Sequence, residues 1–416
     1  MAPMNFIKAP NGAKPVHLVM AKDQTRNVKR GHPWVFQDTL ASLPPAPDGS
    51  LALLKTKTGD ILAKGYYEPG CPIAFRSLVV GRDRLDDALV LGRLERSHSL
   101  RQRLFSDPST TNGFRLVNGE GDGLPGLVID VYGAAAVVKC DGPGAAGFYD
   151  VAGIAEWLVS SVLPATSGQD DTRPCVFLKF RSGDKQGRGE LVAGTLPSGP
   201  VLLLENGARF LVDIVQGQKT GFFLDQRENR ALVRRLVPKG ARVLNLFGYT
   251  GGFSIYAGLG GAGHVTTVDV AVPAIEAACT NWALNGLSPG AHDGRAVDAF
   301  EFLEAAAKAR ERWDVVVADP PSFCPSAKSV ATGSAAYARL FTAAASVTAP
   351  GGLLALASCS SHMPSQAFAD LCEDAVGGGA RRTGRALAMQ GQPPDHPFPM
   401  TCSDLRYLKF NLYQLD

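Results

Sequence analysis

A cysteine at the end of an apolar run is the first candidate for chemistry. Cys359 follows Leu353 to Ser358 and stands in the polar sequence Ser358-Cys359-Ser360-Ser361. A thiolate is a strong nucleophile that needs only modest activation. The change from apolar to polar residues predicts an exposed strand end and a nucleophilic role. The structural alternative is a buried, inert thiol.

A second apolar run, from Trp313, ends in Asp319-Pro320-Pro321-Ser322-Phe323. Two prolines stiffen a loop and remove backbone donors. The Asp319 carboxyl group can then hydrogen-bond the edge of a flat heteroaromatic base while Phe323 stacks on it. The alternative is a rigid loop with a core phenylalanine.

A glycine-containing turn indicates a nucleoside cofactor. The run Val243 to Phe247 continues into Gly248-Tyr249-Thr250-Gly251-Gly252, and the next run ends about twenty residues later at Asp269. Such a turn brings backbone N–H groups close to a ligand, and the acid can bind a ribose diol. Asp298, after the next predicted strand, is expected near the adenine amino group. The GxGxxG triplet and the Walker lysine motif are absent, so the alternative is a generic βαβ turn. The predicted cofactor ligands in this region are Asn245, Phe247, Tyr249, Thr250, Gly251, Asp269, Asp298 and Asp319.

These parts fit one reaction. Carbon 5 of cytosine is too weak a nucleophile to take a methyl group directly, but thiolate addition at carbon 6 makes it enamine-like. Asp319 would stabilise the adduct at N3, and carbon 5 would then attack the sulfonium methyl of S-adenosylmethionine. Loss of the carbon-5 proton and expulsion of Cys359 complete the cycle. A paired base must leave its helix to reach such a site.

The elements that must position these residues alternate between strand and helix after about Gln216. Such alternation predicts a parallel sheet covered on both faces, with ligands bound beyond the carboxyl ends of the strands where the strand order reverses. The expected strands are Val243–Phe247, His264–Asp269, Trp313–Asp319 and Leu353–Ser358, and the expected helices are Gly252–Gly258, Pro273–Asn285, Asp298–Arg310 and Ala335–Val347.

The chain before Gln216 is different in character. Short apolar runs at Val16–Val19, Leu51–Leu54 and Ile61–Ala63, separated by turns, predict a small β-barrel. Leucines at helical spacing predict a connecting helix over Leu85–Phe105. From Thr111 to Ile214 the pattern predicts a second β-rich unit, with a hairpin across Tyr132-Gly133 and a helix over Ala146–Leu163.

Composition limits the class of protein. The 416 residues are 45% hydrophobic and 19% charged, which predicts ordered domains. There is no membrane-length apolar run, convincing signal peptide or zinc-spaced cysteine pair, so we expect a cytoplasmic protein with no metal. The net charge is +3, but residues 1–85 hold twelve Lys or Arg and six Asp or Glu. This basic end suggests a polyanion contact, with an ordinary solvated surface as the alternative.

The chain resembles the bacterial 23S ribosomal RNA cytosine-C5 methyltransferases that carry an N-terminal PUA domain, over nearly its whole length. The resemblance rests on several motifs taken together, as each alone is weak. They are Arg30-Gly31-His32-Pro33-Trp34-Val35-Phe36, Asn118 to Gly126, Gly217 to Arg227, Asn245 to Phe253, Asp319 to Phe323, Ser358-Cys359-Ser360 and Asp395-His396-Pro397.

The resemblance implies an α/β fold in four parts: a PUA-like RNA-binding barrel (1–82), a connecting helix (83–107), a small α/β middle domain (108–214) and a Rossmann-like class I methyltransferase domain (215–416). It implies S-adenosylmethionine as donor, 23S ribosomal RNA or a large-subunit assembly intermediate as partner, and Cys359 as nucleophile. Many related enzymes place a second cysteine directly after the proline of the aspartate motif. Here Ser322 stands there, so Cys324 receives no role in product release.

Further residues are expected at the ligands. Lys219 or Arg227, assisted by Gln226, would hold the donor's carboxylate, with a salt bridge at a helix start as the equal alternative. Pro320 and Phe323 would contact the base, and Arg30 and His32 the RNA, whereas Trp34 is expected in the barrel core. A base N-methyltransferase, which needs no thiol, and a non-catalytic RNA-binding assembly factor remain alternatives. The sequence does not determine the oligomeric state, and a homodimer is one possibility.

Overall fold

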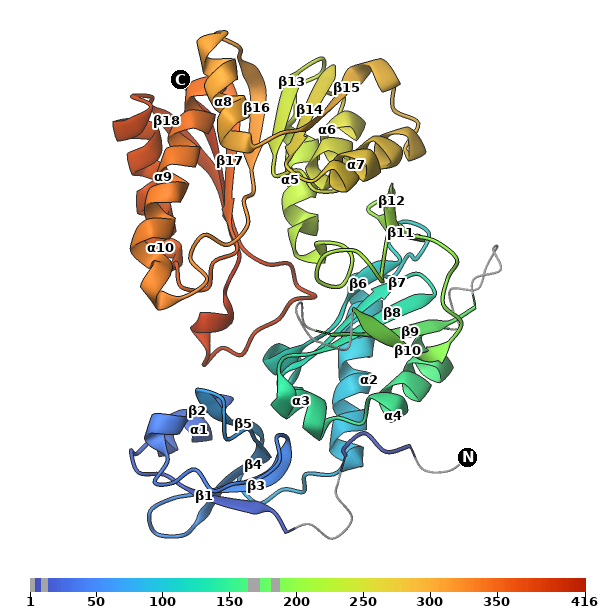
Figure 1. Ribbon diagram of the computed structural model, residues 1–416, viewed down its shortest axis with the longest axis vertical. Helices are drawn as coiled ribbons and strands as arrows, with labels where there is room; N and C mark the ends of the chain where they lie inside the picture. Colours follow the sequence, from blue (N-terminus) through green and yellow to red (C-terminus); the bar gives the residue numbers. More distant parts are fainter. Residues whose placement is uncertain (1–3, 9–13, 164–172, 181–187) are drawn as a thin grey trace. The chain divides into compact units, whose positions relative to one another are not determined.

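The computed structural model describes residues 4–8, 14–163, 173–180 and 188–416. It divides into two compact units (Figure 1). The first contains Met1–Leu204, Val212–Leu224 and Pro394–Ser403, and the second contains Glu205–Leu211, Asp225–Pro393 and Asp404–Asp416. No helix in the described part of the chain is long and apolar enough to cross a membrane.

The first unit begins with a five-stranded sheet in the order β1-β3-β4-β5-β2. Its elements are β1 (Val16–Val19), α1 (Thr25–Lys29), β2 (Trp34–Phe36), β3 (Ser50–Lys55), β4 (Ile61–Tyr67) and β5 (Ile73–Val80). Alternate residues such as Leu18, Leu54 and Phe75 form one buried core, as strand periodicity requires. The three predicted strands are confirmed, and β2 and β5 were missed. Trp34, expected in the barrel core, is only partly buried and lies outside that core. Its indole Nε1 donates to Glu120 at 2.8 Å, so the ring meets a polar partner instead.

The remainder of the first unit packs helices against a second sheet, β10-β9-β8-β7-β6. The strands are β6 (Gly113–Asn118), β7 (Leu127–Tyr132), β8 (Ala135–Cys140), β9 (Cys175–Lys179) and β10 (Gly189–Gly194), and the helices are α2 (Asp87–Leu104), α3 (Pro143–Phe148) and α4 (Val151–Trp157). The single helix predicted over Ala146–Leu163 is wrong. The helix breaks at Tyr149, which is extended, and Asp150 starts α4 by accepting from the N–H of Ala152.

Two of the motifs noted in the sequence pack against each other in this unit. A Cβ atom on Gly121 would lie 1.8 Å from the carbonyl oxygen of Pro397, so only glycine fits that contact. Asn118 Nδ2 donates to the Pro397 carbonyl at 2.8 Å, and the buried Arg101 donates to both Asp122 and the carbonyl of Asp395. These bonds fix the segment 394–403 to the first unit although it lies near the end of the chain.

The second unit is built on a seven-stranded sheet in the order β15-β14-β13-β16-β17-β19-β18. Its strands are β13 (Arg242–Leu246), β14 (His264–Asp269), β15 (His292–Ala296), β16 (Trp313–Ala318), β17 (Thr348–Ser358), β18 (Gly384–Gln390) and β19 (Lys409–Leu415), and its helices are α5 (Arg227–Leu236), α6 (Gly252–Leu259), α7 (Val272–Leu284), α8 (Ala299–Lys308), α9 (Val330–Val347) and α10 (Ser365–Glu373). A hairpin of β11 (Val201–Glu205) and β12 (Ala208–Val212) contains two of the boundaries between the units.

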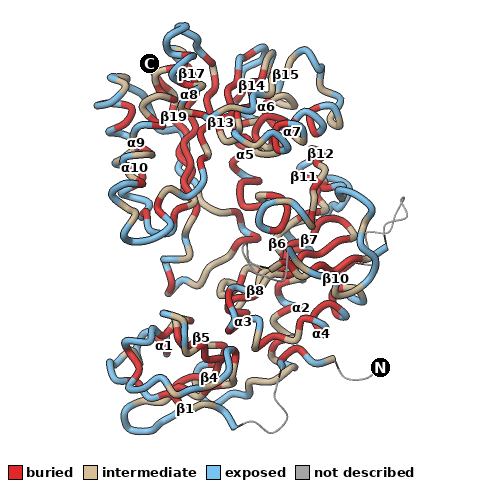
Figure 2. Tube along the Cα trace, viewed as in Figure 1, coloured by how far each residue is buried: buried red, intermediate tan, exposed pale blue. Residues whose placement is uncertain are grey.

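The predicted parallel sheet is confirmed for β13 to β17. The antiparallel edge formed by β19 and β18 was not foreseen. Alternate residues of each central strand enter two separate cores. Figure 2 shows that residues along β13, β14 and β17 are buried. Leu244 and Val316 pack with α8, α9 and α10, whereas Val243 and Val315 pack with α5, α6 and α7. The sheet is therefore covered on both faces, as expected for parallel strands.

The strand order places the predicted site. From β13 the chain adds β14 and β15 on one side, then crosses to add β16 and β17 on the other. The order reverses between β13 and β16, and ligands of such sheets bind beyond the carboxyl ends of the strands at that point. The turn at 247–251 and the loop at 319–323 follow these two strands.

Candidate functional site

The turn after β13 has an uncommon backbone. Phe247 and Tyr249 have φ of 57° and 48°, and Gly251 has φ of 85°. Left-handed conformations are costly for residues with a side chain and cluster at functional sites. Asp269 holds the turn, because its carboxylate accepts from the N–H of Tyr249 at 2.9 Å. The predicted turn and its acid are therefore joined directly.

Buried polar side chains lie beneath this turn. Asn245 Nδ2 donates to Ser254 Oγ at 2.9 Å, and Ser254 in turn bonds Thr267 at 2.6 Å. Two further atoms, Asn245 Oδ1 and Thr250 Oγ1, are buried without a hydrogen-bond partner among the described residues. Buried polar atoms normally have partners. Amino or hydroxyl groups of a nucleoside would satisfy them, so these residues fit S-adenosylmethionine.

Two of the three acids in the cofactor prediction, Asp269 and Asp298, have local backbone partners. Asp269 also accepts from the N–H of Ala271 at 3.0 Å. Asp298 is exposed and starts α8 by accepting from the N–H groups of Phe300 and Glu301. An N-cap of this kind is a sufficient structural reason for an aspartate. The adenine contact of Asp298 stays a prediction.

The side-chain amide of Gln226, just before α5, bonds the Asp319 carboxylate and is itself bonded by an amide within α5. Gln226 Nε2 donates to Asp319 Oδ2 at 3.0 Å, and Asn229 Nδ2 donates to Gln226 Oε1 at 2.5 Å. Gln226 and Asn229 are buried, whereas Asp319 is partly exposed. Gln226, expected at the donor's carboxylate, therefore orients the Asp319 carboxylate in this structure.

Rings connect the two loops at the reversal point. Phe323 meets Phe247 edge to face, with 6.4 Å between ring centroids and 79° between ring planes. It also packs on Tyr337 at 4.8 Å. Phe323 remains partly exposed, and Pro320 is buried. The base loop and the cofactor turn are thus in contact through aromatic side chains.

Cys359 follows the last residue of β17 and is partly exposed. Because β17 pairs with β16, with Leu356 opposite Ala318, the segments carrying Cys359 and Asp319 leave neighbouring strand ends. Hydrogen bonds of Ser360, the residue after Cys359, join this segment to the loop that carries Asp319. The Oγ atom of Ser360 lies 2.8 Å from Ser322 Oγ, and it accepts from the N–H of Cys324 at 3.2 Å. The structure therefore brings the predicted nucleophile and the predicted base loop to one edge.

Two neighbouring groups stay neutral. Burial raises the pKa of the Tyr337 hydroxyl, which bonds Ser358 and Ser360. Burial also raises the pKa of the Cys324 thiol, which is fully buried against Val330. A thiol in this environment is a poor nucleophile, consistent with giving Cys324 no role.

The other predicted ligands divide between the units. Arg227 is buried at the start of α5, and its Nε lies 3.8 Å from Glu205 Oε2. Lys219 belongs to the first unit, where its Nζ lies 5.1 Å from the centroid of the Phe223 ring. Their contacts with the donor's carboxylate stay predictions.

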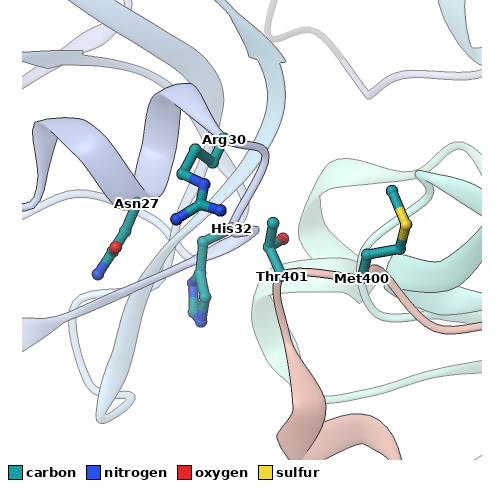
Figure 3. Close-up of a pocket in the computed structure, with 5 residues that line it drawn as sticks. All are labelled: Asn27, Arg30, His32, Met400 and Thr401. Carbon is teal, nitrogen blue, oxygen red and sulfur yellow. The ribbon is translucent and has the colours of Figure 1, made fainter.

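Arg30 and His32 line a pocket of about 280 Å³ in the first unit. Figure 3 shows Asn27, Arg30 and His32 from the N-terminal domain facing Thr401 and Met400 from the segment 394–403. Arg30 and Met400 are exposed. The pocket joins residues that the sequence separates by more than 360 positions.

Sequence reasoning missed Asn229, Tyr337, Ser360 and Lys409. Lys409 was the detectable one, because it interrupts the apolar run Tyr407-Leu408-Lys409-Phe410. It is 3% exposed, and its Nζ donates to the carbonyls of Ser360 at 2.5 Å and Tyr407 at 2.8 Å. The roles of the other three depend on packing between distant segments.

Comparison with known families agrees with this geometry. Residues 178–376 match a family of S-adenosylmethionine-dependent methyltransferases, and residues 18–79 match a PUA-like domain. A methyltransferase structure from Streptococcus mutans shares the fold with a TM-score of 0.80 at 23% identity, covering 96% of this chain and all of that one. A second methyltransferase structure, a complex with S-adenosylhomocysteine, gives a TM-score of 0.81 at 23% identity and the same coverage.

Relatives match the chain from end to end. A ribosomal RNA large subunit methyltransferase of Deinococcus radiodurans is 34% identical over 99% of this chain and 100% of its own length. Ribosomal RNA large subunit methyltransferase I of Alteromonas mediterranea is 35% identical over 94% and 97%. The chain therefore belongs to the family of ribosomal RNA large subunit methyltransferases, and its methyl donor is S-adenosylmethionine.

Proposed function

We propose that the protein methylates carbon 5 of a cytosine in large-subunit ribosomal RNA through a covalent adduct with Cys359. The relatives carry large-subunit ribosomal RNA in their names. The choice of cytosine carbon 5 rests chiefly on one observation. Ser360 bonds the segment of Cys359 to the loop of Asp319, at adjacent strand ends.

Each residue has a defined task in this reaction. The Cys359 thiolate adds to carbon 6, and Asp319 in its protonated form, oriented by Gln226, gives its proton to N3 as negative charge develops there. Phe323 stacks on the base and Pro320 stiffens the loop beneath it. S-adenosylmethionine, held at the turn 245–251 and Asp269, supplies an electrophilic methyl group when bound. Loss of the carbon-5 proton to a base then allows the C–S bond to break and returns the thiolate.

The test is a product analysis with two cysteine variants. Ribosomal RNA from a strain that lacks the gene is incubated with enzyme and S-adenosylmethionine, digested, and analysed for methylated nucleosides by mass spectrometry. Wild type and Cys279→Ala, which removes an exposed thiol on α7, should form 5-methylcytidine, whereas Cys359→Ala should not. Bisulfite sequencing of the same RNA would locate the nucleotide.

The main alternative gives a different result. A base N-methyltransferase needs the aspartate loop but no thiol. Full activity of Cys359→Ala, with a methyl group on a ring or exocyclic nitrogen, would replace the cytosine-C5 assignment with that reaction.

We also propose that the pocket of Arg30, His32 and Asn27 contacts the RNA backbone. Arg30 is exposed, with no ion-pair partner among the described residues, and residues 1–85 carry an excess of positive charge. Exposed arginines favour phosphate groups. Binding of ribosomal RNA fragments to Arg30→Ala, compared with wild type, tests this contact.

A further inference from the structure

Lys409 is a buried lysine at the first residue of β19. It lies opposite Ser358 in the antiparallel pair β17–β19, next to the segment of Cys359. Its side chain is 3% exposed, and two backbone carbonyls, of Ser360 and Tyr407, accept from its Nζ. An ammonium group has three donors, so one N–H is left for another partner.

The charge of Lys409 has no fixed counter-ion. Among the residues that the structure describes, no carboxylate lies within ion-pair distance of its Nζ. Burial lowers the pKa of Lys409 to about 8, while interaction with the thiolate forms of Cys359 and Cys324 raises it. A buried charge is costly unless it is paired. The charges that favour the protonated form of Lys409 are those of the Cys359 and Cys324 thiolates.

We propose that Lys409 is the positioning residue that stabilises the Cys359 thiolate, and that it fixes the nucleophile's backbone through the Ser360 carbonyl. The proposal rests on the proposed function, since it gives that nucleophile its activation. An ammonium group beside a thiol favours the ionised form. At neutral pH most of Lys409 is protonated, so the cation is present when the thiolate is needed.

The other groups around Cys359 do not replace Lys409. Tyr337 on α9 and Cys324 after β16 have raised pKa values, so they stay neutral. Asp319, on the loop from the neighbouring strand end, opposes a second negative charge when ionised. Lys409, bonded to the Ser360 carbonyl beside Cys359, supplies a positive charge that favours the thiolate.

The experiment measures thiol ionisation directly. The purified full chain is alkylated with iodoacetamide between pH 6 and 10, and the rate at each cysteine is followed by peptide mass spectrometry. In wild type, Cys359 should reach half of its maximal rate at a lower pH than the same cysteine in the chain unfolded in urea. In Lys409→Met this midpoint should rise by about one pH unit, a roughly tenfold loss of rate at neutral pH. Lys409→Arg should restore most of it.

Controls separate this role from a structural one. Lys179→Met removes a different buried lysine, in the first unit, and should leave the Cys359 midpoint unchanged. An unchanged midpoint in folded Lys409→Met would overturn the proposal. If that variant does not fold, a midpoint of Cys359 in the folded wild type at or above its midpoint in the urea-unfolded chain would overturn the proposal equally.

The readout needs neither RNA nor S-adenosylmethionine, so it is independent of the cytosine assignment. A low, Lys409-dependent midpoint in an enzyme that forms no 5-methylcytidine would leave this inference intact and reject the proposed function. Formation of 5-methylcytidine by an enzyme whose Cys359 midpoint does not change in Lys409→Met would support the proposed function and reject this inference.

Discussion

Lys179 in the first unit and Lys409 in the second are buried lysines with the same kind of anchorage. Lys179 donates to the carbonyls of Ile214 and Gly217, and Lys409 donates to those of Ser360 and Tyr407. Burial lowers the pKa of each to about 8. Their counter-charges differ. The carboxylate of Asp213 favours the charged form of Lys179. The charged form of Lys409 is favoured instead by the thiolates of Cys359 and Cys324.

The difference separates a structural cation from a chemical one. A carboxylate is ionised throughout the neutral range, so Lys179 has a permanent opposite charge and its carbonyl bonds tie β9 to residues 214–217. A thiol is mostly neutral at that pH unless a cation stabilises its thiolate. Equal burial and equal hydrogen bonding therefore lead to different consequences, decided by the partner.

The largest effect should come from removing the thiol beside Lys409. Cys359→Ala is expected to lower the rate of methyl transfer by about a thousandfold or more, because the adduct that activates carbon 5 can no longer form. Single-turnover assays with ribosomal RNA measure the rate. Binding of S-adenosylmethionine, followed by calorimetry, should be unchanged, since the donor site is made by other residues. A rate within tenfold of wild type would show that the Cys359 thiol has no chemical role and that Lys409, like Lys179, is a structural cation.

A smaller loss should follow from changing the acid on the neighbouring strand end. Asp319→Asn keeps the shape of the side chain but removes the proton that it gives to N3, so we expect a loss of about a hundredfold in rate. Gln226→Glu is the matched variant, because it places a second carboxylate against Asp319 and should favour protonation of the pair. Because protonation is favoured, the pH–rate profile of Gln226→Glu should shift to higher pH than that of wild type. Identical pH–rate profiles for Gln226→Glu and wild type would contradict the role of Asp319 in the reaction.

Much of this edge could be predicted because the chemistry lies close to regular strands. The apolar runs ending at Asp269, Asp319 and Ser358 are strands β14, β16 and β17, and parallel strands place their carboxyl ends together. The strand expected before Asp298 received no bounds, because the sequence of β15, His292-Asp293-Gly294-Arg295-Ala296, has no apolar run. It pairs as an edge strand of the parallel set, where backbone hydrogen bonds to β14 suffice.

What the sequence could not provide were contacts between distant segments. Gln226 and Asp319 are 93 residues apart, and Lys409 and Ser360 are 49 residues apart. No periodicity relates such positions. The first contact joins the turn before α5 to the loop after β16, and the second depends on how β19 returns antiparallel beside β17. The same holds for the segment around Pro397, whose fit against Gly121 was visible only as two separate motifs.

The two lysines should also affect stability in a pH-dependent way. A lysine with a folded pKa of about 8 and an ordinary value of 10.5 opposes folding while both states are protonated. Between about pH 8 and 10.5 the unfolded chain binds more protons, so stability rises with pH. Lys409→Met and Lys179→Met should each remove part of this rise, on the order of 2 kcal/mol.

Urea unfolding at several pH values measures these contributions. Cys359→Ala provides the contrast: loss of the thiolate should lower the pKa of Lys409 and start the rise at a lower pH, while leaving the contribution of Lys179 unchanged. A flat pH dependence in wild type between pH 8 and 10 would show that neither lysine is buried as a charge.

The smallest effect is expected at an exposed cation, which extends the comparison to the surface. Arg30 stands in solvent at the pocket of His32 and Thr401, so it carries little desolvation cost and its partner would be a phosphate. Arg30→Ala should weaken RNA binding several-fold and reduce the slope of log affinity against log salt by about 1. Lys22→Ala is the control, because Lys22 is already paired with Asp38 at 2.7 Å. Equal slopes for Arg30→Ala and wild type would place the RNA elsewhere on the first unit. A changed slope would show that this exposed cation acts on the substrate by attraction alone, whereas Lys409 acts through the ionisation of its neighbour.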